Sequence, residues 1–131
     1  MRNKMARPLS RGINHVGLTV PDLHQATEFL KKALDARFVY NGLTDNDPPR
    51  KGTDTERQLG LSPDSMIIRQ RLLRIGNGPN LELFEIVSRE QEQPVRLQDI
   101  GWNHISLYVD DIDYAVERVK AAGGKFLSEI H

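Results

Sequence analysis

The sequence of 131 residues contains no cysteine, and this absence excludes a disulfide framework, a thiolate nucleophile and a cysteine-ligated zinc site. It also agrees with a reducing, cytoplasmic location. The 18 Lys and Arg residues balance the 18 Asp and Glu residues, so no net charge favours nucleic acid or an anionic membrane as a partner. No apolar run approaches the roughly 18 residues that a membrane span needs. We expect residues 1–12, which have four basic residues and no apolar segment, to form a disordered tail.

What the sequence does contain is an internal repeat. Residues 14–31 and residues 103–120 lie 89 positions apart and share eight identities in 18 positions. Chance matching gives roughly one identity in seventeen positions for average compositions. The repeat therefore predicts a duplicated structural module.

Each copy has the pattern of a strand followed by a helix. Aliphatic residues alternate with polar or small ones over residues 15–20 and again over 104–109, which is typical of strands with one buried face. Asp22 and Asp111 then stand where a helix N-cap is expected, before apolar residues at helical spacing. A short strand is predicted after each helix, at residues 37–40 and 125–127.

The rest of the first copy is predicted to be a long polar loop and a hairpin. The loop covers residues 41–65, with a helical turn at 56–61. Strands at 66–75 and 81–87 flank the turn at 76–80, so the first module at 13–87 has the order strand, helix, strand, strand, strand. A connector at 88–100 leads to the second copy at 101–131, which has no counterpart of the hairpin. We therefore expect an α+β fold of paired βαβββ modules forming one cup-shaped mixed sheet, with an incomplete second module and an unpaired sheet edge.

The repeat also places two histidines at equivalent positions. His15 and His104 lie on the faces of their strands opposite the aliphatic residues, and a pseudo-twofold axis would bring the two imidazoles together. Glu82 lies on the last strand of the first module among apolar neighbours, where a carboxylate is costly unless it is paired or bound to a cation. His15, Glu82 and His104 are thus a candidate metal-binding set. The alternative is that each histidine hydrogen-bonds within the sheet and Glu82 is solvated. The recurrence of the histidine in both copies favours metal binding over this alternative.

Three segments carry a resemblance to a known family. The stretches NHVGLTVPDL at 14–23, NLELFEI at 80–86 and GWNHISLYVDDID at 101–113 resemble the glyoxalase/bleomycin resistance/extradiol dioxygenase superfamily, also called vicinal oxygen chelate proteins. The resemblance implies paired βαβββ modules around a divalent metal ion, Ni, Zn, Co, Mn or Fe. In the glyoxalase I pattern His15, Glu82 and His104 match three ligands, and a carboxylate such as Glu82 also transfers the proton. The fourth ligand, a glutamate on the last strand of the second module that is also a candidate catalytic base in glyoxalase-like members, has no counterpart within the 131 residues.

Four further residues are candidates for substrate binding. Phe84, Trp102 and Tyr108 share strand parity with the histidines and Glu82, so they either line the cup or belong to the ordinary core. Arg71 lies on a strand with two mixed faces, together with Arg69 and Arg74. It either holds a substrate carboxylate in the cup or lies on a solvated face.

The resemblance implies a metal-dependent lyase or isomerase acting on a small substrate with two neighbouring oxygens. A glutamate at position 82 favours a glyoxalase-like lyase, because epimerases of the superfamily have glutamine there. The alternatives are a metal-free protein that sequesters a small molecule or drug in the same cup, and an Fe(II) extradiol ring-cleaving dioxygenase. We also expect a homodimer, because symmetric dimers are the commonest oligomers and the open sheet edges can be buried against a second copy.

Overall fold

The computed structural model describes residues 7 and 9–129, so the tail expected at 1–12 lies partly outside the described residues. The fold is α+β, as predicted, and its elements follow in the order β1 (His15–Thr19), α1 (Leu23–Leu34), β2 (Arg37–Leu43), α2 (Thr53–Leu59), β3 (Met66–Arg74), β4 (Asn80–Val87) and α3 (Ile112–Ala121). Residues 15–87 thus have the predicted strand and helix order, and the helical turn expected at 56–61 in the long loop is helix α2.

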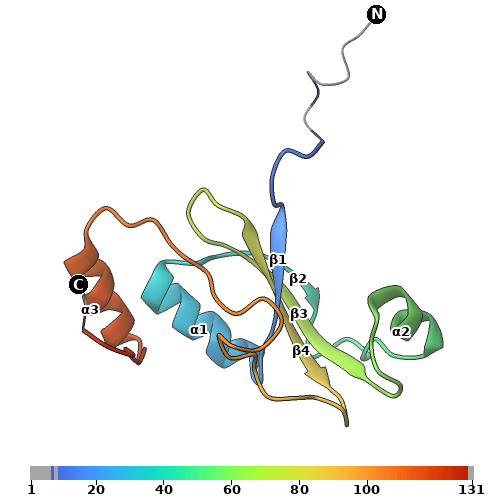
Figure 1. The fold of residues 1–131 in the computed structure, drawn as a ribbon. Helices are drawn as coiled ribbons and strands as arrows, with labels where there is room; N and C mark the ends of the chain where they lie inside the picture. The colour runs from blue at the N-terminus through green and yellow to red at the C-terminus, as the bar shows by residue number, and fades with distance from the viewer. Residues whose placement is uncertain (1–6, 8, 130–131) are drawn as a thin grey trace, which may run out of the picture.

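The four strands form one open, mixed sheet in the order β1-β4-β3-β2 (Figure 1). β1 runs parallel to β4, whereas β2, β3 and β4 are antiparallel neighbours. The parallel pair arises because the chain crosses over through α1, β2 and β3 before β4 returns beside β1. This return places Gly17 opposite Glu82 and His15 opposite Asn80, so the first strand of the module meets the last.

Helix α1 covers one face of the sheet, and the core lies between them. The side chain of Asp22 caps the helix by accepting a hydrogen bond of 3.0 Å from the backbone N–H of Gln25. Apolar residues of the helix, of the link from α1 to β2 and of the two central strands then form the buried cluster: Leu23, Leu30, Ala36, Leu73, Leu81 and Leu83. Burial of each leucine side chain stabilises the fold by about 1.5–3 kcal/mol. The opposite face of the sheet carries His15 and Glu82.

The second copy of the repeat keeps its helix but not its strands. Helix α3 begins after Asp111, whose side chain accepts a hydrogen bond from the backbone N–H of Tyr114. Asp22 caps α1 in the same way in the first copy. The strands predicted at 104–109 and 125–127 are wrong: both segments lack regular secondary structure. A strand needs a neighbouring strand for its backbone hydrogen bonds, and neither segment has one among the described residues. Ile105, Leu107 and Val109 accordingly remain 55%, 42% and 47% exposed.

Helix α3 lies beside α1 in Figure 1, although the two helices are about 90 residues apart in the chain. The guanidinium of Arg118 donates hydrogen bonds to the backbone carbonyls of Lys31 and Lys32, at the end of α1. The carbonyl of Lys31 also accepts a hydrogen bond of 3.1 Å from the backbone N–H of the capping residue Asp35. The arginine adds a second donor there and places its charge at the negative end of the helix dipole. One contact thus joins the helices of the two copies.

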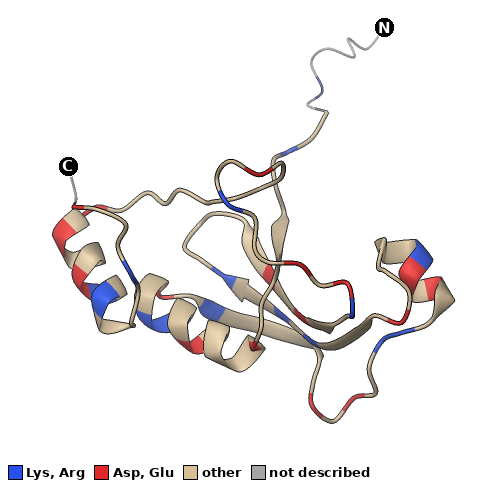
Figure 2. Cartoon of the chain, turned by 60° about the horizontal axis from the view of Figure 1, so that its bottom comes forward, with Lys and Arg blue, Asp and Glu red and all other residues tan. Residues whose placement is uncertain are grey.

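Acidic and basic positions are interspersed over the three helices, and no helix is covered by one sign of charge (Figure 2). Within residues 7 and 9–129, none of the helices has the length and apolar character needed to cross a membrane.

Candidate metal centre

His15 and Glu82 lie side by side on the face of the sheet opposite α1. His15 begins β1, and Glu82 belongs to the neighbouring strand β4. Nε2 of His15 is 3.7 Å from Oε1 of Glu82, and the two side chains are 46% and 19% exposed. The sequence argument for this pair, that strand parity places both residues away from the helix-covered face, agrees with their positions.

A glutamine holds the other oxygen of Glu82. Nε2 of Gln70, on β3, donates a hydrogen bond of 2.8 Å to Oε2 of Glu82. Gln70 fits there because Gly42 on β2 has no side chain: a Cβ atom at Gly42 would lie only 3.0 Å from Cδ of Gln70. The glutamine therefore fixes the carboxylate and leaves Oε1 facing the imidazole.

Two asparagines border the pair. Nδ1 of His15 is 2.8 Å from Oδ1 of Asn14, so the ring is held from the side opposite Glu82. Asn80 is the register partner of His15 on β4 and shares strand parity with Glu82. Its Oδ1 is shielded from solvent and has no hydrogen-bond partner among the described residues. A shielded acceptor without a donor is a feature that a bound ligand or water would satisfy.

His104 does not join this pair in the structure. It lies in the irregular segment before α3, and its Nδ1 contacts Oδ1 of the preceding Asn103. Within the part of the chain that the structure describes, no three His, Asp or Glu side chains form a group able to hold a metal ion. The three-ligand set of His15, Glu82 and His104 therefore stays a prediction, of which the structure brings two members together.

The aromatic candidates divide in the same way. Phe84 shares the face of Glu82, and its ring lies 3.6 Å from the position of a Cβ atom on Gly17, next to the pair. Trp102 and Tyr108 lie in the irregular segment around His104 and are almost fully exposed, at 91% and 108%. The structure thus places one of the three aromatic residues beside His15 and Glu82.

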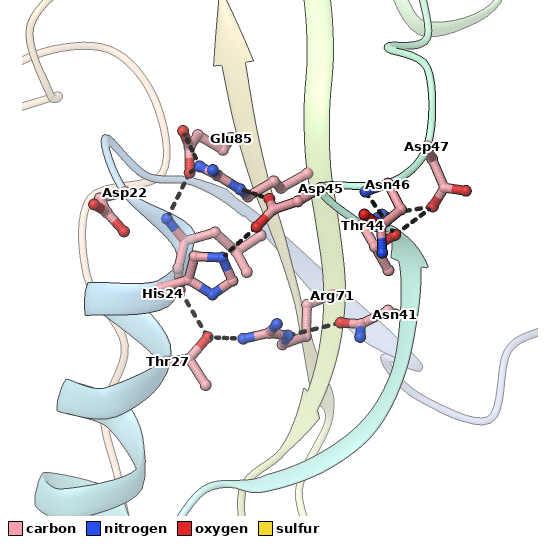
Figure 3. Close-up of polar contacts among 12 residues, drawn as sticks. Asp22, His24, Thr27, Asn41, Thr44, Asp45, Asn46, Asp47, Arg71 and Glu85 are labelled. Carbon is pink, nitrogen blue, oxygen red and sulfur yellow. Dashed lines mark hydrogen bonds and ion pairs between the residues drawn. The ribbon is translucent and has the colours of Figure 1, made fainter.

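Arg71 lies on the helix-covered face. It is the register partner of buried Leu83, and its guanidinium donates hydrogen bonds to Oγ1 of Thr27 on α1 and to Oδ1 of Asn41 on β2 (Figure 3). The sheet separates it from His15 and Glu82. The structure therefore does not bring Arg71 to the candidate site, because the register of the hairpin turns its side chain toward α1.

A second polar cluster surrounds the start of α1 on this same face. Both oxygens of Glu85 accept hydrogen bonds of 2.8 Å from Arg69, and Oε1 also accepts 2.8 Å from the backbone N–H of Leu23. Arg69 reaches on to Asp45, whose second oxygen lies 3.5 Å from Nε2 of His24 (Figure 3). The hydrogen bond from Arg69 lowers the pKa of Asp45, and the bonds to Asp45 and Glu85 raise the pKa of Arg69. These charges satisfy one another and anchor the helix to β3 and β4.

Gln70 and Asn80 were not recognised from the sequence as members of the site. The signal for Asn80 was its spacing of two residues before Glu82 on the same strand. Gln70 had no comparable signal, because its place beside Glu82 depends on the register between β3 and β4.

In the open mixed sheet, the first strand of the module lies beside the last, and a histidine and a glutamate meet where the two strands join. This arrangement defines a βαβββ protein with a candidate metal centre. The chain belongs to the Glyoxalase/Bleomycin resistance protein/Dioxygenase superfamily, whose family model matches residues 14–131. The resemblance seen in the sequence is thereby confirmed.

Comparisons with individual proteins agree with this family. The chain is 34% identical over 118 residues to a 2-epi-5-epi-valiolone epimerase from Actinomyces sp. The match covers 89% of the chain and 62% of the relative, so the chain spans less than two thirds of that relative's length. The fosfomycin resistance protein FosX from Mesorhizobium loti has 26% identity and a TM-score of 0.52, over 88% of this chain and 72% of that one. FosX from Listeria monocytogenes, in complex with Mn(II) and sulfate, shares the fold at 23% identity and a TM-score of 0.53, over 88% of this chain and 74% of that one.

Proposed function

We propose that the protein is a metal-dependent isomerase of its superfamily, which transfers a proton within a small substrate that carries two neighbouring oxygens. The observation that carries this proposal is the pairing of His15 with Glu82, at 3.7 Å, on the open face of the sheet. Imidazole nitrogen and carboxylate oxygen are both ligands of divalent transition metals.

The geometry of the pair fits a shared ion. Two ligand atoms about 2.1 Å from one tetrahedral metal lie about 3.4 Å apart, close to the separation of Nε2 and Oε1. Neither atom has a closer hydrogen-bond partner among the described residues, while the remaining polar atoms of both side chains contact Asn14 and Gln70. We propose His104 as a third ligand on the strength of the repeat.

The relatives support an isomerase in preference to the other activities of the superfamily. The epimerase from Actinomyces sp is the relative with 34% identity, and epimerisation removes and returns a proton at one carbon. The Listeria FosX complex contains Mn(II), which makes Mn(II) the first metal to test here. The glyoxalase-like lyase expected from Glu82 involves the same proton transfer, so the product distinguishes the two.

Each residue of the site has a defined part in the proposed reaction. When bound, the metal ion would polarise the two substrate oxygens and stabilise negative charge that develops on them. A carboxylate oxygen of Glu82 takes the proton from the carbon beside these oxygens, and a proton returns from solvent to the opposite face of that carbon, which inverts it. Gln70 orients that carboxylate through Oε2, and Phe84 keeps water from one side of the substrate. The shielded Oδ1 of Asn80 accepts a hydrogen bond from a substrate hydroxyl.

Proton exchange with solvent tests the proposal. The chain is incubated in D₂O with Mn(II) and 2-epi-5-epi-valiolone, and proton NMR follows deuterium entering the substrate carbon. We expect exchange by the wild type, a loss of at least about 100-fold in Glu82→Gln, and unchanged exchange in His24→Ala, which alters a histidine on the other face. Absence of exchange with Mn, Ni, Zn and Co, or equal rates in Glu82→Gln and wild type, would contradict it. Oxygen uptake with a catechol and Fe(II) would assign a ring-cleaving dioxygenase instead.

We also propose that the protein forms a homodimer. β1 is an edge strand, and Ile105, Leu107 and Val109 are half exposed, so a second copy could cover both features. Light scattering at tens of micromolar should give twice the mass of 14.9 kDa, and a monomer mass would contradict this proposal.

A further inference from the structure

The same side-chain contact occurs in both copies of the repeat. Nδ1 of His15 faces Oδ1 of Asn14, and Nδ1 of His104 faces Oδ1 of Asn103. The surroundings of the two pairs differ completely, because His15 begins a strand whereas His104 lies in an irregular segment. The contact is therefore a property of the Asn-His dipeptide and not of the sheet around it.

The orientation of the second asparagine points to the ring nitrogen that carries the proton. Nδ2 of Asn103 donates a hydrogen bond of 3.3 Å to the backbone carbonyl of Gly101, so the amide oxygen is the atom that faces His104. A carbonyl oxygen can only accept, and the imidazole must then donate from Nδ1. In a neutral ring this leaves Nε2 unprotonated, with its lone pair available.

We propose that Asn14 and Asn103 are positioning residues that hold His15 and His104 in the Nδ1–H tautomer. Free neutral histidine prefers the Nε2–H tautomer, so the asparagines reverse the ordinary preference. In the first copy this tautomer leaves two electron-pair donors facing each other, because Nε2 of His15 lies 3.7 Å from Oε1 of Glu82, beyond hydrogen-bond distance. The opposite tautomer would direct an N–H at the carboxylate and occupy the nitrogen that a metal needs.

The tautomer is a property of the metal-free chain, whereas its use in metal binding rests on the proposed function. A ligand histidine is commonly oriented by a hydrogen bond from its second nitrogen to an acceptor. Here the acceptor is the residue directly before the histidine, so a single dipeptide contains both the ligand and the group that orients it.

Long-range proton–nitrogen NMR of the metal-free chain tests the proposal, at a pH above about 8, well above the ordinary histidine pKa of about 6.5. We expect a protonated Nδ1 and an unprotonated Nε2 in both His15 and His104. His24 is the internal control: the residue before it is Leu23 and not an asparagine, so it should show the ordinary Nε2–H tautomer in the same spectrum.

Substitutions separate positioning from structure. Asn14→Ala should return His15 to a majority of the Nε2–H tautomer without changing His104, and Asn103→Ala should do the reverse. Asn14→Asp keeps an acceptor and should retain the Nδ1–H tautomer. Backbone amide spectra check that each variant is folded. A majority of Nε2–H in the wild type, or no change in Asn14→Ala, would overturn the proposal. Because no metal is added, this result is independent of whether the chain binds Mn(II).

Discussion

Glu82 and Glu85 are three residues apart on β4 and face opposite sides of the sheet. Glu82 accepts a hydrogen bond from Gln70 and leaves one oxygen facing His15, whereas Glu85 accepts bonds from Arg69 and from the start of α1. One carboxylate is therefore available for chemistry, and the other is committed to structure. Strand alternation alone, which is readable from the sequence, assigns the two glutamates to different faces.

Glu85→Gln should destabilise the fold by about 2 kcal/mol, because the side chain is 12% exposed and its loss of charge weakens three hydrogen bonds. Urea unfolding measures the difference. Asp54→Asn is the matched control, since Asp54 and Arg57 are 83% and 77% exposed, and it should change the stability by no more than about 0.5 kcal/mol. Equal losses in both variants would show that burial does not strengthen the Glu85 interactions.

The pH dependence of the free energy of unfolding should show the contribution of the Asp45 carboxylate. Its pKa is lowered in the folded chain by Arg69, so its contribution is present above the ordinary value of 3.8 and is lost as the pH falls through the lower, folded value. Asp45→Asn lacks this contribution at every pH. Its free energy of unfolding should therefore decrease less than that of the wild type as urea titrations move from pH 5 to lower pH. Parallel curves for the two proteins would contradict the assignment.

At the scale of elements, the first module could be predicted because its signals are local. The N-cap aspartate, the apolar spacing of α1 and the turn between β3 and β4 each lie within a few residues of the element that they specify. Register is not local, so the face occupied by Arg71 and the contact of Gln70 with Glu82 were not predictable. The strand expected at 104–109 has the correct alternation but lacks a neighbour, and alternation without a partner does not make a strand.

Leu83→Ala should cost about 3 kcal/mol, because Leu83 is fully buried between β4 and α1 and its loss leaves a cavity. Leu97→Ala removes the same atoms from a side chain that is 75% exposed in the connector, and it should change the stability by less than about 0.5 kcal/mol. Chemical denaturation of the two variants compares them directly. A small loss in Leu83→Ala would mean that α1 does not pack on the sheet as described.

At the scale of the whole molecule, the described residues form one four-stranded sheet with an open edge at β1, and a helix from the second copy lies beside α1. It matches 62% of the length of the epimerase from Actinomyces sp. Two of the three predicted metal ligands meet on the open face of this sheet, and the third lies in a segment without a strand partner. The central claim is that His15 and Glu82 bind one divalent ion together.

Titration of the chain with Mn(II), with the free ion followed by electron paramagnetic resonance, tests this claim most directly. We expect the wild type to bind one ion, and His15→Ala and Glu82→Gln each to weaken binding by at least about tenfold, because each removes a ligand atom. His24→Ala, on the opposite face, should bind as the wild type does. Binding that is unchanged in His15→Ala and Glu82→Gln, or lost equally in His24→Ala, would contradict the account.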